Sequence, residues 1–317
     1  MHAGRFLAGV VLGLAMCLAG AGIASAQQAQ EEENGVPAHL IVTVEPRQGS
    51  VAPVINRDDV MVYQGKTRST VTDWVPAQGE HAGLEFFILV DDGVNTSVGS
   101  QLDDIRHFID AQPSTTKIGV AYMQNGIARI QQNLTDDHSL GQKALRLPQG
   151  IPGINSSPYL SLSDLIKRWP ATQDRREVLM VSDGIDPLYG SGDLLDPYLS
   201  ASVDDARKAG VIVYAIYTPG AGRLGRSYWA SYWGQIYLSQ VAEETGGDAF
   251  YIGFNGPPVA FAPYLDQVAN RLGSQYLLTF LAKPTQKAQW QRVRVSTEVS
   301  NADLVSADEV YVTPPKK

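Results

Sequence analysis

Apolar positions along this chain follow two spacings that alternate from residue 84 onward. Continuous apolar runs, such as residues 84–90 and 211–217, are separated by segments whose apolar residues recur every three or four positions. A continuous run is typical of a strand buried on both faces of a parallel sheet, and the second spacing is typical of a helix that packs on such a sheet. The alternation predicts an α/β fold with a doubly wound, mostly parallel sheet.

Strands and helices are expected in turn through this part of the chain. The helix after the first strand has an apolar stripe of Leu102, Ile105, Phe108 and Ile109, and a later helix is expected to end at Gly210. The expected strands are residues 84–90, 117–123, 128–134, 176–183, 211–217 and 248–254. The other helices are expected near residues 138–147, 158–169, 195–209, 235–245 and 261–272.

Short strand-like runs flank the α/β segment at both ends. Residues 38–75 contain three such runs, with a hairpin turn expected at Gln64-Gly65-Lys66. Residues 275–282, 289–298 and 308–314 are expected to be strands near the other end. The predicted division is an N-terminal β unit at 37–80, an α/β domain at 82–282 and a C-terminal β extension at 283–317.

The first 36 residues have the pattern of an export signal followed by a flexible linker. Arg5 precedes an apolar run, and Ala24-Ser25-Ala26 fits a cleavage site, so residues 1–26 are predicted to be removed and residues 27–36 to be a polar linker. The apolar run is short for a membrane span, and no later run is long enough to be one. The mature chain is expected in the periplasm or outside the cell.

Composition narrows the classes of partner and of chemistry. The sole cysteine, Cys17, leaves with the signal, which excludes disulfides and thiolate metal sites in the mature protein. The formal net charge is −8 and no run of Lys or Arg occurs, which argues against nucleic acid and anionic membrane surfaces as partners.

Two of the buried strands end in aspartate. Asp91 follows residues 84–90, and Asp183 ends the strand at 176–183. The carboxyl ends of parallel strands meet at the edge of the sheet where ligands bind. Buried carboxylates there need a cation or hydrogen-bond donors, and Mg²⁺ prefers carboxylate, hydroxyl and water oxygens.

At these positions the chain resembles the von Willebrand factor type A (VWA) family. The metal-ion-dependent adhesion site of that family begins with Asp-x-Ser-x-Ser, takes a threonine from a later loop and ends with an aspartate, often in Ser-Asp-Gly. In this chain Asp91-Asp92-Gly93-Val94-Asn95, the loop 155–160 and Ser182-Asp183-Gly184 occupy those places. The resemblance extends through residues 59–66, 242–247 and 276–297 to a family of secreted bacterial VWA-related proteins, and it covers nearly all of residues 38–313.

The resemblance implies a degenerate metal site. Gly93 replaces the first serine and offers no ligand, Asn95 replaces the second, and Ser156 or Ser157 stands for the threonine. Asp91, Asn95, one of these serines and Asp183 would hold Mg²⁺ or Mn²⁺ weakly. The alternative is that both aspartates cap helices or bond loop amides without a metal.

A cluster of aromatic residues follows the strand at 211–217. Tyr228, Trp229, Tyr232, Trp233 and Tyr237 recur at helical spacing. Such a stripe is either packed in the core or, on the same edge as the aspartates, a surface that binds a partner. The sequence leaves both interpretations open.

The resemblance favours a non-catalytic module that binds a protein at the carboxyl edge of the sheet. Residues 220–225 match Gly-x-Gly-x-x-Gly, but an aromatic segment follows them, which argues against a dinucleotide site. One alternative is a Mg²⁺-dependent hydrolase of the aspartyl-phosphatase kind, with Asp91 as nucleophile, although Gly93 stands where its general acid would be. A structural envelope protein with no edge site is the other alternative.

Overall fold

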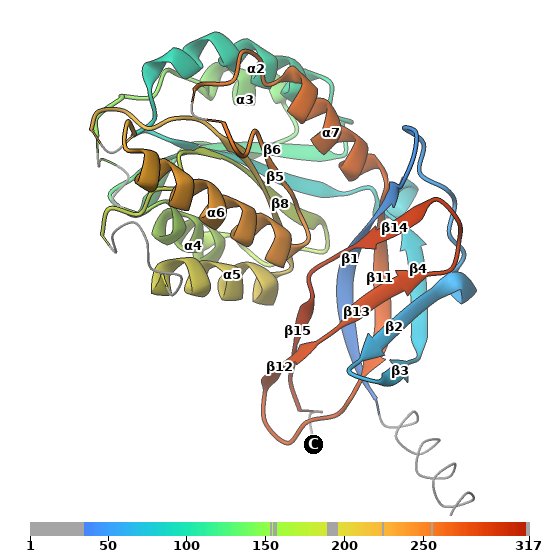
Figure 1. The fold of residues 1–317 in the computed structure, drawn as a ribbon. Helices are drawn as coiled ribbons and strands as arrows, with labels where there is room; N and C mark the ends of the chain where they lie inside the picture. Colours follow the sequence, from blue (N-terminus) through green and yellow to red (C-terminus); the bar gives the residue numbers. More distant parts are fainter. Residues whose placement is uncertain are drawn as a thin grey trace, which may run out of the picture.

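The computed structural model describes residues 35–152, 154, 157–188, 196–223, 225–254 and 256–314. The predicted signal at 1–26 and most of the predicted linker lie outside these residues. The described chain forms an α/β domain and, beside it, a body made only of strands (Figure 1).

A mostly parallel sheet forms the centre of the α/β domain, as the sequence predicts. Its strand order is β10-β9-β8-β5-β6-β7. All neighbouring strands run parallel except β6 and β7, which run antiparallel. The strands are β5 (Leu84–Asp91), β6 (Thr116–Gln124), β7 (Ile127–Thr135), β8 (Arg175–Ser182), β9 (Val211–Tyr217) and β10 (Ala249–Phe250).

Helices cover both faces of this sheet, which makes it doubly wound. In Figure 1, α2, α3 and α7 lie on one face and α4, α5 and α6 on the other. The helices are α2 (Leu102–Asp110), α3 (His138–Ala144), α4 (Pro158–Arg168), α5 (Pro197–Ala209), α6 (Tyr228–Thr245) and α7 (Ala262–Gly273). Gly210 ends α5 in the left-handed conformation, as predicted.

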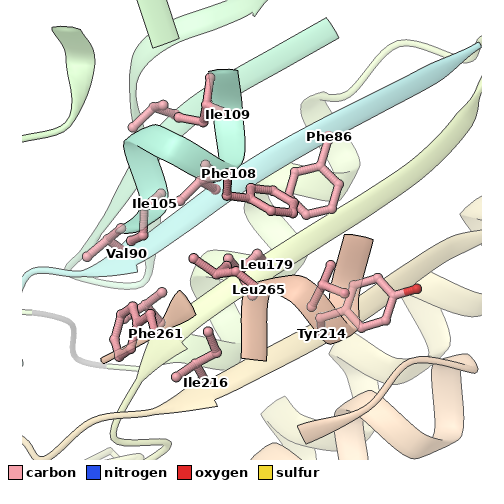
Figure 2. Packing of buried hydrophobic residues seen from close by; sticks show 14 of the residues in the cluster. Phe86, Val90, Ile105, Phe108, Ile109, Leu179, Tyr214, Ile216, Phe261 and Leu265 are labelled. Carbon is pink, nitrogen blue, oxygen red and sulfur yellow. The ribbon is translucent and has the colours of Figure 1, made fainter. Parts of the chain in front are cut away.

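Alternate residues of each central strand face opposite cores, because successive side chains of a strand point to opposite sides. Phe86 and Val90 of β5 pack with Phe108 of α2 and Leu265 of α7 in one core, where Figure 2 shows Phe86 and Phe108 close together. Phe87 of β5 belongs to the other core, with side chains of α4, α5 and α6. Every residue of β5 is buried, which explains its continuous apolar run.

The strands predicted at the two ends of the chain form a single body instead of two separate extensions. One sheet has the order β14-β1-β11-β4 and a second has the order β13-β2-β3, while β12 pairs with β15. Both groups contribute to one hydrophobic core. The strands are β1 (Val36–Pro46), β2 (Val60–Gln64), β3 (Thr67–Ser69), β4 (Val71–Pro76), β11 (Gln275–Ala282), β12 (Gln289–Arg292), β13 (Arg294–Thr297), β14 (Ala302–Val305) and β15 (Glu309–Val312).

This pairing differs from the predicted division of the chain. The sequence places the end of the α/β domain at residue 282, whereas β11 lies between β1 and β4 in the all-strand body. Among the described strands of the N-terminal group only β2 and β3 are neighbours in a sheet, and among those of the C-terminal group only β12 and β15 are. A two-stranded ladder is marginally stable alone, and pairing the two groups provides a shared core. The expected hairpin turn is present, with Gln64 of β2 paired to Thr67 of β3.

Two further elements differ from their predictions. The strand expected at 248–254 is reduced to β10, because Tyr251 at φ 61° and Gly253 at φ 91° turn the chain out of extended geometry. The helix expected at 235–245 begins at Tyr228, so the aromatic cluster lies on its first turns and not in a loop.

Ion pairs join the two bodies. Arg207 of α5, whose side chain is 6% exposed, pairs with Asp308 and Glu309 near β15 and also with Glu244 of α6. Arg271 of α7 pairs with Glu45 of β1. The α/β domain, which contains the carboxyl edge of the sheet, is therefore joined to the all-strand body by ion pairs.

Candidate functional site

The structure brings Asp91 and Asp183 to the same edge of the sheet. Their strands, β5 and β8, are parallel neighbours, with Val90 opposite Val181. Asp91 is the last residue of β5 and Asp183 directly follows β8. The hydroxyl of Ser182 donates a 2.8 Å hydrogen bond to Asp91 Oδ2 and so links the two strand ends.

Both carboxylates are buried, and each accepts a hydrogen bond from a loop amide. Asp91 is fully buried and its Oδ1 accepts a 2.6 Å hydrogen bond from the Gly93 amide. Asp183 is 8% exposed and its Oδ1 accepts a 2.9 Å bond from the Ile185 amide. Burial and then repulsion by Asp91 raise the pKa of Asp183 well above its ordinary value. The arrangement therefore favours a proton on Asp183.

Two other predicted metal ligands, Asn95 and Ser157, make hydrogen bonds at the starts of helices. Asn95 is exposed, and its Oδ1 accepts a hydrogen bond from the Ser97 amide at the start of a short 3-10 helix, η3 (Thr96–Gln101). Ser157 is buried, where its hydroxyl donates to Asp186 and accepts from the Leu160 amide at the start of α4. Ser156 lies outside the described residues. Among the described residues of the predicted set, Asp91 and Asp183 lie at neighbouring strand ends.

The described residues of the predicted set do not assemble the oxygen ligands that Mg²⁺ or Mn²⁺ requires. Within the described ranges, no group of three or more His, Cys, Asp or Glu side chains is placed to hold a metal. Mg²⁺ needs near-octahedral oxygen ligands, whereas the oxygens of Asn95 and Ser157 are committed to helix starts and Gly93 has none to give. The geometry resembles the metal-free alternative, in which the aspartates bond loop amides.

A glycine-rich loop covers Asp183, a contact that the sequence analysis did not predict. The loop after β9 runs along the loop after β5, where Asn95 donates to the Pro219 carbonyl and Ala221 donates to the Gly93 carbonyl. A Cβ on Gly220 would lie 1.9 Å from Asp183 Oδ2, and one on Gly225 would collide with the Gly220 carbonyl. The Gly-x-Gly-x-x-Gly pattern is therefore explained by close packing, of Gly220 on the Asp183 carboxylate, of Gly222 at φ 72° on Pro152 and of Gly225 on the backbone of Gly220.

Asp92 holds a second loop, which sequence reasoning also missed. Its fully buried carboxylate accepts hydrogen bonds of 2.6 and 2.7 Å from the two terminal nitrogens of Arg146. The guanidinium of Arg146 lies 3.8 Å from the centre of the Tyr122 ring. Burial by itself would raise the pKa of Asp92, but the bonds from Arg146 and Gln124 outweigh it and hold that pKa below its ordinary value.

The aromatic cluster is mostly on the surface. Tyr228 is 61% exposed, Trp229 is 66% exposed and Tyr232 is 46% exposed, while Trp233 is half-buried and Tyr237 is buried. The rings contact one another in sequence, from Tyr228 and Trp229 at 5.5 Å to Tyr232 and Trp233 at 5.7 Å. We call Tyr228, Trp229, Tyr232 and Trp233 the aromatic surface. Because α6 begins at the carboxyl edge, this surface adjoins the loop that covers Asp183.

No protein-family model and no curated protein matches the sequence. Among solved structures, an aerotolerance-related membrane protein from Bacteroides fragilis, carrying multiple mutations to serine, is 13% identical; the match covers 60% of this chain and 98% of that one, with a TM-score of 0.40. The SpRpn10 VWA domain is 14% identical, with 58% and 94% covered and a TM-score of 0.35. The ArnB paralog VWA2 from Sulfolobus acidocaldarius is 8% identical, with 88% and 76% covered and a TM-score of 0.36.

Two of these structures are named as VWA domains, the family that the sequence resembles. Their TM-scores lie below 0.5 and their identities below 25%, so these matches carry no information about the function of this chain. In the described part of the chain, no helix combines the length and apolar composition that a membrane crossing requires.

Proposed function

We propose that this chain is an exported, non-catalytic VWA-type module that binds a protein partner at the carboxyl edge of its sheet. The observation that carries the proposal is the aromatic surface, where three large rings are 46% to 66% exposed on the first turns of one helix. Contiguous exposed apolar groups on a soluble domain mark sites of interaction. Tryptophan and tyrosine are also enriched among the residues that dominate binding energy.

The surface is held in place before a partner arrives, which supports the same proposal. Ser227 caps α6 by accepting a hydrogen bond from the Ala230 amide, and Gly246 ends the helix in the left-handed conformation. Tyr237 anchors the stripe in the core beneath. A preorganised surface loses less conformational entropy on binding than a loop would.

The aspartates support a non-catalytic role. An aspartyl-phosphatase needs an accessible carboxylate nucleophile and a general acid nearby. Asp91 is fully buried, both of its oxygens accept hydrogen bonds, and Gly93 supplies no acid. If the chain does turn over generic phosphate esters and Asp91→Asn abolishes that turnover, the non-catalytic proposal is wrong.

The binding proposal is tested by comparing variants as baits for the exported proteins of the cells that make this chain. Trp229→Ala with Tyr232→Ala should remove the proteins that the wild type retains, at unchanged thermal stability. Tyr311→Ala is the matched control, because Tyr311 is a 40% exposed aromatic residue on the all-strand body. Retention of the same proteins by the double variant would contradict the proposal. A wild type that retains no more than the double variant would favour the structural envelope alternative.

A further inference from the structure

In the described loops of the carboxyl edge, the aspartates are buried and two arginines are exposed. Five loops or connections lie at this edge of the sheet. Their described residues are 92–101, 145–152, 154, 157, 183–188, 196, 218–223, 225–227, 251–254 and 256–261. The aspartates described in these segments are at most 8% exposed, and they are Asp92, Asp183, Asp186 and Asp196. By contrast, Arg223 and Arg226 are exposed. The exposed charges described on the loop that leads into α6 are therefore positive.

These two arginines directly precede the aromatic surface. Arg226 stands two residues before Tyr228, and its Nε donates a 3.0 Å hydrogen bond to the Gly222 carbonyl, which orients the guanidinium group. Neither Arg223 nor Arg226 makes an ion pair within the described part of the chain. Residues 219–234 contain both arginines and no acidic residue. The segment is thus a local cationic patch on a chain whose formal net charge is −8.

We infer that the partner docks an acidic peptide segment here, one that places Asp or Glu beside an apolar side chain. This inference rests on the proposed function and names the chemistry of the partner. The apolar side chain would pack on Trp229 and Tyr232, and the carboxylates would pair with Arg223 and Arg226, whose planar guanidinium groups suit carboxylates. No metal ion is needed for this recognition.

The difference in charge between the cationic patch and the chain as a whole orients an acidic partner as it docks. The net charge of −8 disfavours the approach of an acidic partner in general, whereas the two exposed arginines beside the aromatic surface attract it locally. Charge would then select the docking edge, and the aromatic rings would supply most of the affinity. A basic partner would be attracted to other faces instead.

A random library of twelve-residue peptides displayed on phage tests the inference without a known partner. The library is selected on the purified exported chain in EDTA, so that carboxylates bridged by a cation do not contribute. We expect enriched peptides that carry Asp or Glu next to Phe, Trp or Leu. Charge reversal by Arg223→Glu with Arg226→Glu should weaken the best such peptide at least tenfold. Arg57→Glu with Arg292→Glu makes the same change of net charge on the all-strand body and should leave binding unchanged.

The outcomes separate the inference from the proposed function. Neutral or basic peptides that need Trp229 would overturn the acidic partner and leave the binding proposal standing. Peptides that bind Trp229→Ala equally well, or no enrichment at all, would overturn both. Binding to phosphatidylethanolamine–phosphatidylglycerol vesicles that Trp229→Ala abolishes, with no peptide enriched, would assign this surface to an anionic membrane and overturn the peptide inference.

Discussion

Gly220 and Asp183 are packed so closely that no side chain fits between them. A Cβ on Gly220 would lie 1.9 Å from Asp183 Oδ2, well inside van der Waals contact. The loop after β9 therefore covers the Asp183 carboxylate on one side, and the ends of β5 and β8 lie on the other. This contact limits the access of solutes to the Asp183 carboxylate.

Gly220→Ala is expected to lift this loop and destabilise the protein by about 2 kcal/mol, the usual cost of forcing an extra carbon into a packed interior. The measurement is urea unfolding. Gly256→Ala is the control, since a Cβ there meets nothing within 4 Å, and it should change stability by less than about 0.5 kcal/mol. Equal stability of the two variants would show that the loop does not seat on Asp183.

Asp183→Asn should change the pH dependence of stability. Burial and the repulsion by Asp91 raise the pKa of Asp183 above its ordinary value of 3.8, so the folded state binds this proton more tightly than the unfolded state does. The resulting stability is complete below pH 3.8 and is lost as the pH rises through the raised pKa. The variant stays neutral throughout, so it should exceed the wild type at pH 8 and differ little at pH 4. Parallel pH profiles in urea would contradict this.

The placement of the two aspartates could be predicted from sequence because it follows from topology alone. Asp91 and Asp183 end buried runs, and parallel neighbouring strands must end at the same edge. The fold class followed from the same alternation of runs. Neither prediction required knowledge of which side chains touch.

The remaining features depend on contacts between distant segments, which spacing does not encode. Asn95 and Ser157 have the right atoms for ligands, but in the structure those atoms accept hydrogen bonds from amides at helix starts. The exposure of Trp229 could not be distinguished from core packing, because both have helical spacing. The all-strand body joins residues more than 200 positions apart, as in the pairing of Thr43 with Gln275.

Arg146→Ala is expected to cost about 3 kcal/mol, because it leaves the fully buried carboxylate of Asp92 without its cation. Asp92→Ala made in the Arg146→Ala background should recover part of this loss, since the uncompensated charge is then removed. A double-mutant cycle in urea measures the coupling. Additive single costs would show that the pair does not act as a unit.

Arg207→Ala should loosen the junction between the two bodies. Its side chain is 6% exposed and holds Glu244 and Glu309, each at 3.1 Å. Since these partners are partly exposed, we expect a loss of about 2 kcal/mol in urea and faster proteolysis near β15. Arg47→Ala removes an ion pair that is more than half exposed on both sides and should cost less than about 0.5 kcal/mol. Indistinguishable variants would mean that Arg207 does not fix the junction.

Mg²⁺ and Mn²⁺ are expected to leave the melting temperature unchanged relative to EDTA. A ligand that binds only the folded chain at about 100 times its Kd adds about 2.7 kcal/mol, so a filled site would raise the melting temperature visibly. The measurement belongs at pH 8, because a proton on Asp183 competes with a cation for the same oxygens, and high pH gives the metal its best chance. Asp183→Ala is the control. A rise in the melting temperature of the wild type that this variant loses would contradict the prediction. It would show that Asp91 and Asp183 bind a metal even though Asn95 and Ser157 bond helix starts, because a cation bound between the two carboxylates depends on Asp183.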